Sequence, residues 1–178
     1  MKKTLISLSV VILLVVAGMT AWTKTTNPVY TKLSSINVQD ARSLYTALTP
    51  DEKREVWRAK LANINTDDLN ELQIKFIKKT IKSLDTLSFD GTDDRKKTKT
   101  EYAEAAKLFE PAKLAEYFGR IGNTVGMQKV SAGCECSVGE DFCSSTSIPW
   151  HCEYGQCSGR LGCGWLWTGY CDGACFPG

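Results

Sequence analysis

The last 45 residues contain all eight cysteines of this 178-residue chain, and the 133 residues before them contain none. The same segment holds three of the five tryptophans and eight of the fourteen glycines, but few aliphatic residues. So short a segment cannot build an ordinary hydrophobic core, and disulfides or metal must therefore hold its shape. The cysteines are Cys134, Cys136, Cys143, Cys152, Cys157, Cys163, Cys171 and Cys175.

Residues 1–23 have the layout of a signal peptide. Two lysines precede an apolar run at residues 5–16, and small residues then lead into a polar stretch. We expect cleavage after Ala21 or Thr23. The alternative is an uncleaved inner-membrane anchor, since residues 5–22 are about long enough to span a bilayer. In both cases the remainder is exported, so we expect a secreted or periplasmic protein whose eight cysteines form four disulfides.

The spacing of the cysteines favours disulfides over a zinc site. Zinc modules use pairs of cysteines two to four residues apart, usually repeated as two knuckles. Here the successive gaps are one, six, eight, four, five, seven and three residues, with no C-x₂-C pair. We therefore expect no metal and no cofactor. Which of the 105 pairings forms is left open, but Cys134 and Cys136 are not expected to bond each other because so small a ring is strained.

Residues 37–121 predict an α-helical bundle of about four helices, preceded by a lead segment at residues 24–36. Apolar residues recur there at helical spacing, and capping residues mark the starts. The expected helices run over residues 38–48 with Asn37 as the N-cap, from a capping box at Thr49, from Thr66, and over residues 100–117. Pro111 should kink or divide the last of them.

Two polar stretches are expected to be connections. Residues 90–94 predict a solvated turn, because they lack the glycine and glutamate positions of a calcium loop. Residues 122–133 are rich in glycine and predict a flexible linker where a protease would cut. The linker would join the helical domain to a small, irregular or β-structured, disulfide-rich module at residues 134–178.

The charge distribution excludes one function class and suggests an internal contact. The first three residues carry +2, residues 24–133 carry +4 and the tail carries −4, which sum to the net +2. No strong basic patch is present, so we expect no nucleic-acid binding. The basic body and acidic tail are expected to dock on each other through a lysine stripe, formed by Lys75, Lys78, Lys79 and Lys82.

The sequence offers poor material for an enzyme. The body has no histidine and no cysteine, and its carboxylates fall near lysines on predicted polar faces. The one histidine, His151, lies between Trp150 and Cys152, and we interpret it as a surface residue. We therefore expect no catalytic residues and no enzymatic activity.

The tail carries aromatic residues that a 45-residue disulfide knot is not expected to bury in full. One interpretation is that two or three of them form a small core. The other is an exposed aromatic face for a membrane interface or a carbohydrate, because tryptophan and tyrosine favour sites with one wet and one apolar side. Both interpretations are left open for Trp150, Tyr154, Trp165, Trp167 and Tyr170.

The tail also resembles a known family. Residues 133–137, Gly-Cys-Glu-Cys-Ser, are followed by Asp-Phe-Cys at 141–143, and this resembles the opening of the fulvocin C bacteriocins. The pieces at 162–164 and 167–171 resemble the C-terminal half of the same family. Residues 48–57 are similar to the helical leader of the proteins grouped as fulvocin C-related.

The resemblance implies a bacteriocin-type peptide made as a precursor and acting on the envelope of competing bacteria or on an unknown receptor. Ala132 corresponds to the start of the mature peptide. We expect the helical part to act as a pro-domain that shields the tail until the linker is cut. The alternative is an uncleaved, secreted or anchored binding module whose aromatic tail contacts a glycan or a protein.

Overall fold

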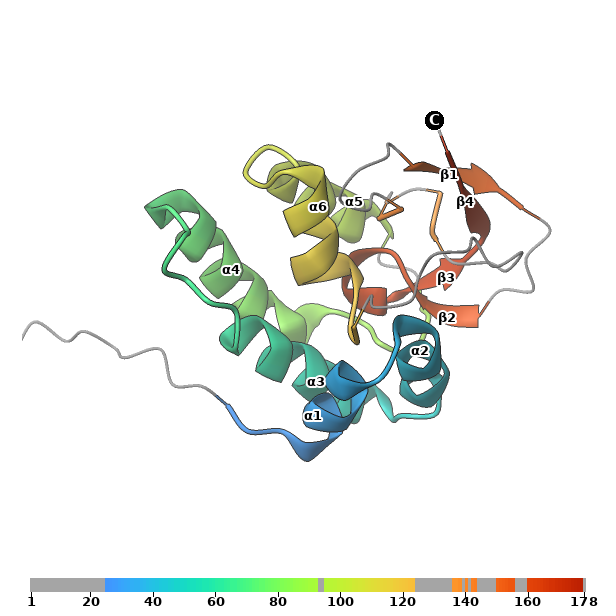
Figure 1. Cartoon of the computed structure of the whole chain (residues 1–178), viewed down its shortest axis with the longest axis horizontal. Helices are drawn as coiled ribbons and strands as arrows, with labels where there is room; N and C mark the ends of the chain where they lie inside the picture. The colour runs from blue at the N-terminus through green and yellow to red at the C-terminus, as the bar shows by residue number, and fades with distance from the viewer. Residues whose placement is uncertain are drawn as a thin grey trace, which may run out of the picture.

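The computed structural model describes residues 25–92, 95–123, 136–138, 140, 142–143, 150–155 and 160–177. The predicted signal peptide, residues 124–133 of the predicted linker, Cys134 and Cys157 lie outside these ranges. Helices form one side of the molecule, and short strands form the other (Figure 1).

The described residues contain six α-helices, where the sequence analysis expected four. The helices are α1 (Pro28–Ser35), α2 (Val38–Thr46), α3 (Pro50–Ala62), α4 (Glu71–Ser83), α5 (Arg95–Ala105) and α6 (Pro111–Leu114). Helix α1 forms within the predicted lead segment. Asn27 caps its start and Pro28 occupies its first position, and both residues favour the beginning of a helix. The predicted last helix is divided at Pro111, and a turn of π-helix, η2 (Ala115–Gly119), continues from α6.

The capping signals were read correctly at two helices and wrongly at a third. Asn37 caps α2, and the Thr49–Glu52 capping box opens α3, both as predicted. Helix α4 begins at Glu71 rather than near Thr66, because Asn70 and Gln73 form the capping box there. The residues from Thr66 form a turn instead, in which the Asn65 side chain accepts a hydrogen bond from the Asp67 N–H.

The C-terminal segment forms two separate two-stranded antiparallel sheets. Strand β1 (Trp150–Tyr154) pairs with β4 (Gly173–Pro177), and β2 (Arg160–Cys163) pairs with β3 (Gly169–Cys171). A short 3₁₀ turn, η3 (Trp165–Trp167), connects β2 to β3. The predicted helical bundle with a small, disulfide-rich, partly β C-terminal part is thus confirmed in outline.

Three disulfides cross-link the described part of this segment: Cys136–Cys152, Cys143–Cys175 and Cys163–Cys171. The first attaches residues before β1 to that strand, and the second attaches Cys143 to β4. The third closes the β2–β3 hairpin around η3. Six of the eight cysteines are therefore paired as the prediction of disulfides requires.

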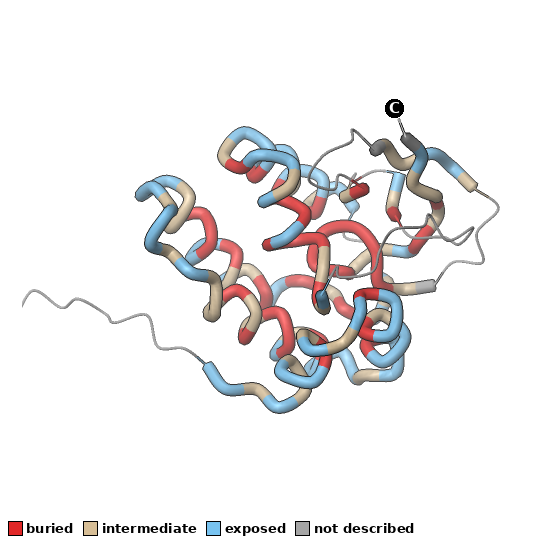
Figure 2. The backbone as a smooth tube through the Cα atoms, in the orientation of Figure 1, coloured by how far each residue is buried: buried red, intermediate tan, exposed pale blue. Residues whose placement is uncertain are grey.

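One buried core is shared by the helices and the C-terminal segment. Turn η3 lies at the centre of the molecule between α3 and the α5–α6 region, where Figure 2 shows an almost continuous run of buried backbone. Its three residues belong to the same apolar cluster as side chains from α1 to α5 and η2. Within the described chain, none of the helices has both the length and the apolar composition needed to cross a membrane.

Candidate functional site

The feature that joins the two parts of the protein is the hairpin of residues 160–171, called here the tryptophan insert. Strands β2 and β3 form its stem, and the Cys163–Cys171 disulfide ties its base. Trp165, Leu166 and Trp167 form its tip and are 0%, 0% and 1% exposed. The insert therefore places two indoles from the cysteine-rich segment inside the helical bundle.

Trp165 is held by hydrogen bonds at both its backbone and its ring. Its indole N–H donates to Oε2 of Glu101 on α5, at 2.8 Å. Its backbone N–H donates to Oε2 of Glu140 in the tail. The ring stacks on Phe118, with centroids 4.8 Å apart and planes 14° apart, and meets Phe76 edge to face. This single side chain thus contacts α4, α5 and η2.

Trp167 contacts a different set of helices. Its indole N–H donates to the backbone carbonyl of Gly119, at 2.7 Å. Its ring meets Tyr45 of α2 and Trp57 of α3 edge to face, at centroid distances of 5.1 and 6.1 Å. The Arg42 guanidinium lies 5.4 Å from the centroid of the same ring. The two tryptophans together therefore contact five helical elements.

The conformation of the insert tip is strained, and burial stabilises it. Leu166 and Trp167 have φ of 51° and 54°, a region that costs about 1–3 kcal/mol for each such residue. Burying an indole removes about 150–250 Å² from water, which stabilises by about 4–6 kcal/mol per ring. Gly164 precedes the tip with φ of 70°, and a side chain there would collide with Oε2 of Glu140. Burial of the tip in the body therefore offsets the strain of its backbone.

A second contact between tail and body involves Phe142. A Cβ on Gly119 would lie only 2.5 Å from the Phe142 ring, so the absence of a side chain at Gly119 allows this close approach. The Phe142 ring also meets Tyr102 of α5 edge to face at 5.2 Å. Gly119 thus serves both contacts, accepting the Trp167 indole and leaving room for Phe142.

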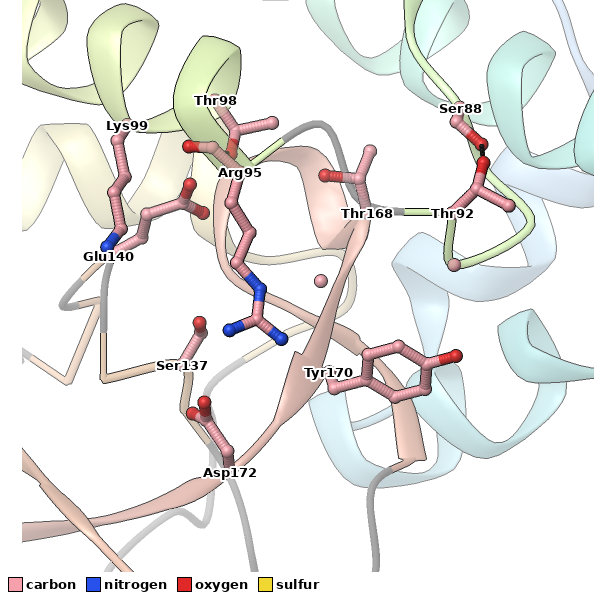
Figure 3. A pocket seen from close by; sticks show the side chains of 12 residues that line it. Ser88, Thr92, Arg95, Thr98, Lys99, Ser137, Glu140, Thr168, Tyr170 and Asp172 are labelled. Atoms are coloured by element: carbon pink, nitrogen blue, oxygen red, sulfur yellow. Dashed lines mark hydrogen bonds between the residues drawn. The ribbon is translucent and has the colours of Figure 1, made fainter.

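A polar cavity of about 80 Å³ lies along the junction of the two parts (Figure 3). Its walls come from the turn after Ser88, from α5, and from the tail. By the same measure one water needs about 10–15 Å³, so the cavity is large enough for a few waters or a small solute. The lining residues are Ser88, Gly91, Thr92, Arg95, Thr98, Lys99, Ser137, Glu140, Thr168, Gly169, Tyr170 and Asp172.

Two basic and two acidic side chains line this cavity, so its charges balance, and most of these groups contact other residues. Figure 3 shows the Arg95 guanidinium pointing between Ser137, Asp172 and Tyr170. The Asp172 carboxylate accepts the Val138 N–H at 2.8 Å and so fixes the tail backbone. Among described residues we identify no nucleophile–base pair here, and the volume does not fit a large cofactor.

Glu140 is the buried acid of the cavity wall, at 5% exposure. Its pKa is raised, mainly because burial disfavours the charged carboxylate. Glu101 raises it further, whereas hydrogen bonds from Thr98 and the Trp165 N–H, together with the charge of Lys99, oppose the rise. The carboxyl is thus a structural acceptor for the insert.

Residues 90–92, the described part of the turn predicted at residues 90–94, form a turn beside the cavity. The Asp90 carboxylate accepts hydrogen bonds from the Ser88 and Thr92 hydroxyls and from the Thr92 N–H. These bonds lower the pKa of Asp90 to about 2. Asp90 therefore closes the turn on itself, and Gly91 presents backbone to Tyr170.

The residues predicted for an exposed aromatic face are not brought together on one face. Trp165 and Trp167 are buried in the shared core, because each indole finds a hydrogen-bond acceptor there. Tyr154 is 81% exposed, and Tyr170 is exposed at the cavity wall. The Trp150 side chain lies outside the described residues. His151 bonds Glu153 at 2.7 Å, and both side chains are partly exposed.

The predicted lysine stripe does not account for the docking that the structure describes. Lys75, Lys78, Lys79 and Lys82 are exposed on α4, and Lys79 pairs with Glu104 of α5 at 2.5 Å. The contacts of the insert with the body are instead mainly apolar, with hydrogen bonds to Glu101 and Gly119 and one cation, Arg42 of α2, against the Trp167 ring. Sequence reasoning missed Glu101 because it treated the carboxylates of the body as surface charges.

Among the described residues, one group of acidic, cysteine or histidine side chains is close enough together to hold a metal ion, and it consists of three cysteines. The sulfurs of Cys136, Cys143 and Cys152 lie within 4.8 Å of one another. All three belong to disulfides, with Cys143 bonded to Cys175. Disulfide sulfurs are not the thiolates that zinc requires.

Comparison with known proteins adds no relative: no family model, curated protein or solved structure matches this chain. The likeness to the fulvocin C-related family therefore remains a prediction from the residues that carry it.

Truncating one insert tryptophan tests the importance of the shared core. We expect Trp167→Ala to lower the free energy of unfolding by about 3–5 kcal/mol, because it removes a buried ring and leaves a cavity. Tyr154→Ala, at the most exposed tail aromatic, is the control and should change it by less than about 0.5 kcal/mol. Urea denaturation measures both. Equal losses in the two variants would contradict the account.

The raised pKa of Glu140 predicts a pH dependence of stability. Because the folded chain holds this proton to higher pH than the unfolded chain, the Glu140 contribution to stability is greatest in acid. It falls as pH rises from the ordinary value of 4.5 through the raised one. Glu140→Gln should remove this fall, whereas Glu71→Gln, at an exposed position on α4, should not. Urea denaturation at a series of pH values checks this, and parallel curves for wild type and Glu140→Gln would refute it.

Proposed function

We propose that this chain is an exported precursor of a disulfide-stapled, bacteriocin-like antibacterial peptide. The helical body, residues 25–123, carries the C-terminal segment in a masked form. The observation that supports the proposal most is the burial of Trp165 and Trp167 inside the body.

These tryptophans are residues that a peptide would use at a bacterial envelope. Indole rings favour the membrane–water interface, where one edge is wet and the other lies in hydrocarbon. The tail is acidic, so simple attraction to anionic lipid does not supply its affinity. The tail's composition therefore favours aromatic contact as its means of binding an envelope, and in the intact chain both of these indoles are buried in the body.

The disulfides also allow the tail to be separated from the helical body by a single cut in the backbone. Every cysteine lies after residue 133, so disulfides cannot join the tail to the body. The three described disulfides all close within the tail. A cut in the predicted linker would therefore leave a cross-linked peptide with no covalent bond to the helices.

A second candidate is an uncleaved, secreted or anchored binding module. Tyr154, Tyr170 and Phe176 support it, because all three remain exposed in the intact chain. This module would contact a glycan or a protein through these exposed rings while the insert holds the tail on the body.

An inhibition assay separates the two candidates. The intact chain is cut at a protease site engineered into residues 124–133. The tail is then isolated in denaturant without reductant, so that its disulfides survive, and returned to buffer. We expect the tail to inhibit growth of susceptible bacteria at concentrations where the intact chain does not, and Trp165→Ala/Trp167→Ala tail to lose the effect.

The assay requires a check that the tail is correctly oxidised. Four disulfides make it lighter than its reduced form by about 8 Da, two hydrogens per bridge. A fully oxidised tail that inhibits none of the strains tested, or an intact chain as inhibitory as the tail, would contradict the precursor proposal. Recovery of uncut chain alone from culture supernatant would favour the binding module.

A further inference from the structure

We infer that the helical body is itself a binding protein for the cysteine-rich segment, so that cutting the linker does not release the peptide. The cut chain stays together as a two-chain complex, and release is a separate step. The inference rests on the proposed function only in assuming that the chain is cut, and its test needs no antibacterial activity.

The body supplies a composite acceptor for the insert. Five helical elements each contribute one or two groups that contact an indole, and two of these groups accept its hydrogen bonds. They are Arg42 and Tyr45 of α2, Trp57 of α3, Phe76 of α4, Glu101 of α5, and Phe118 and Gly119 of η2. Four of the seven are aromatic, so the acceptor is mainly apolar, with a polar group at each indole nitrogen and one cation beside the Trp167 ring.

This arrangement has the features of a strong protein–protein interface. Binding energy at interfaces concentrates in a few buried aromatic anchors that fill pockets and are sealed from water. Trp165 and Trp167 are such anchors, and Phe142 adds a third ring against Gly119. The disulfide at the base of the insert limits the freedom it would lose on binding, which favours affinity.

A cut in residues 124–133 would break none of the described contacts. The body ends its described part at Asn123, whose N–H donates to the Ile36 carbonyl at 2.9 Å. This bond anchors the end of the body at the α1–α2 junction. The contacts of the tail with the body described above start at Glu140, which Thr98 bonds, and at Phe142, and they are made by side chains that a cut leaves in place. Cutting thus removes the tether but not the interface, and only the effective concentration falls.

Removal of the insert from the helical body would expose apolar surface on both pieces. The body would present Tyr45, Trp57, Phe76 and Phe118 to water, and the tail would present two indoles. The body would also leave the Glu101 carboxylate without its indole donor. The separated state is therefore disfavoured, and a target must compete for the indoles to release the tail.

The test uses the full, oxidised chain with a site-specific protease sequence in residues 124–133. After complete cutting, verified on a denaturing gel, gel filtration is run over a dilution series. We expect both pieces to elute together at the volume of the uncut chain at about 1 μM, because anchors of this kind support such affinities. Separation of the wild-type pieces at that concentration would overturn the inference.

Three variants connect the result to the insert. Trp167→Ala should raise the dissociation constant by about 30-fold or more, as removal of a dominant anchor does. Trp167→Phe keeps a ring but loses the bond to Gly119 and should show a smaller increase, which covers the case in which the alanine variant does not fold. Tyr154→Ala, at an exposed site, should leave co-elution unchanged. The assignment of affinity to the insert would be overturned if the Trp167→Phe pieces had the same dissociation constant as the wild-type pieces while the Tyr154→Ala pieces bound each other more weakly than both.

The two proposals fail separately. Pieces that stay together while the isolated tail proves inert would leave the binding inference standing and remove the bacteriocin function. Pieces that separate on cutting, with a tail that inhibits growth, would do the reverse.

Discussion

The insertion of two indoles into the helical bundle is the interaction on which the rest of the structure depends. Trp165 and Trp167 complete a core that α2, α3, α4 and η2 do not close among themselves. The strained tip, the glycine before it and the disulfide behind it all serve to present these rings. Glu101, Glu140 and Gly119 accept the three N–H groups that burial removes from water.

This dependence explains why the two parts of so uneven a sequence belong together. A cysteine-rich segment with few aliphatic residues obtains its shape from disulfides and its core from the body. The body, in turn, receives two large rings in place of further apolar side chains of its own. Charge has a smaller part than the opposite signs of the two parts suggest, since the lysines of α4 are exposed and Lys79 pairs with Glu104.

Local signals in the sequence predicted local structure well. Thr49 with Glu52, Asn37 and Pro111 mark helix boundaries through contacts a few residues away, and the even cysteine count with the export signal predicted disulfides. Long-range partners could not be predicted. Nothing near Trp165 in the chain indicates an acceptor 64 residues earlier, and Glu101 carries the same local pattern as a surface charge. The Gly-Trp-Leu-Trp sequence in a cysteine-closed loop is the one signal that could have suggested a docking element.

Hydrogen exchange of the indole N–H groups tests most directly whether tail and body form one cooperative core. Both are followed by NMR together with the backbone N–H of Ile77, a fully buried residue of α4. The account predicts that the Trp165 and Trp167 indoles exchange as slowly as Ile77, because all three open only when the whole chain unfolds. Rapid indole exchange while Ile77 stays protected would show that the insert leaves an intact body, and would contradict the shared core.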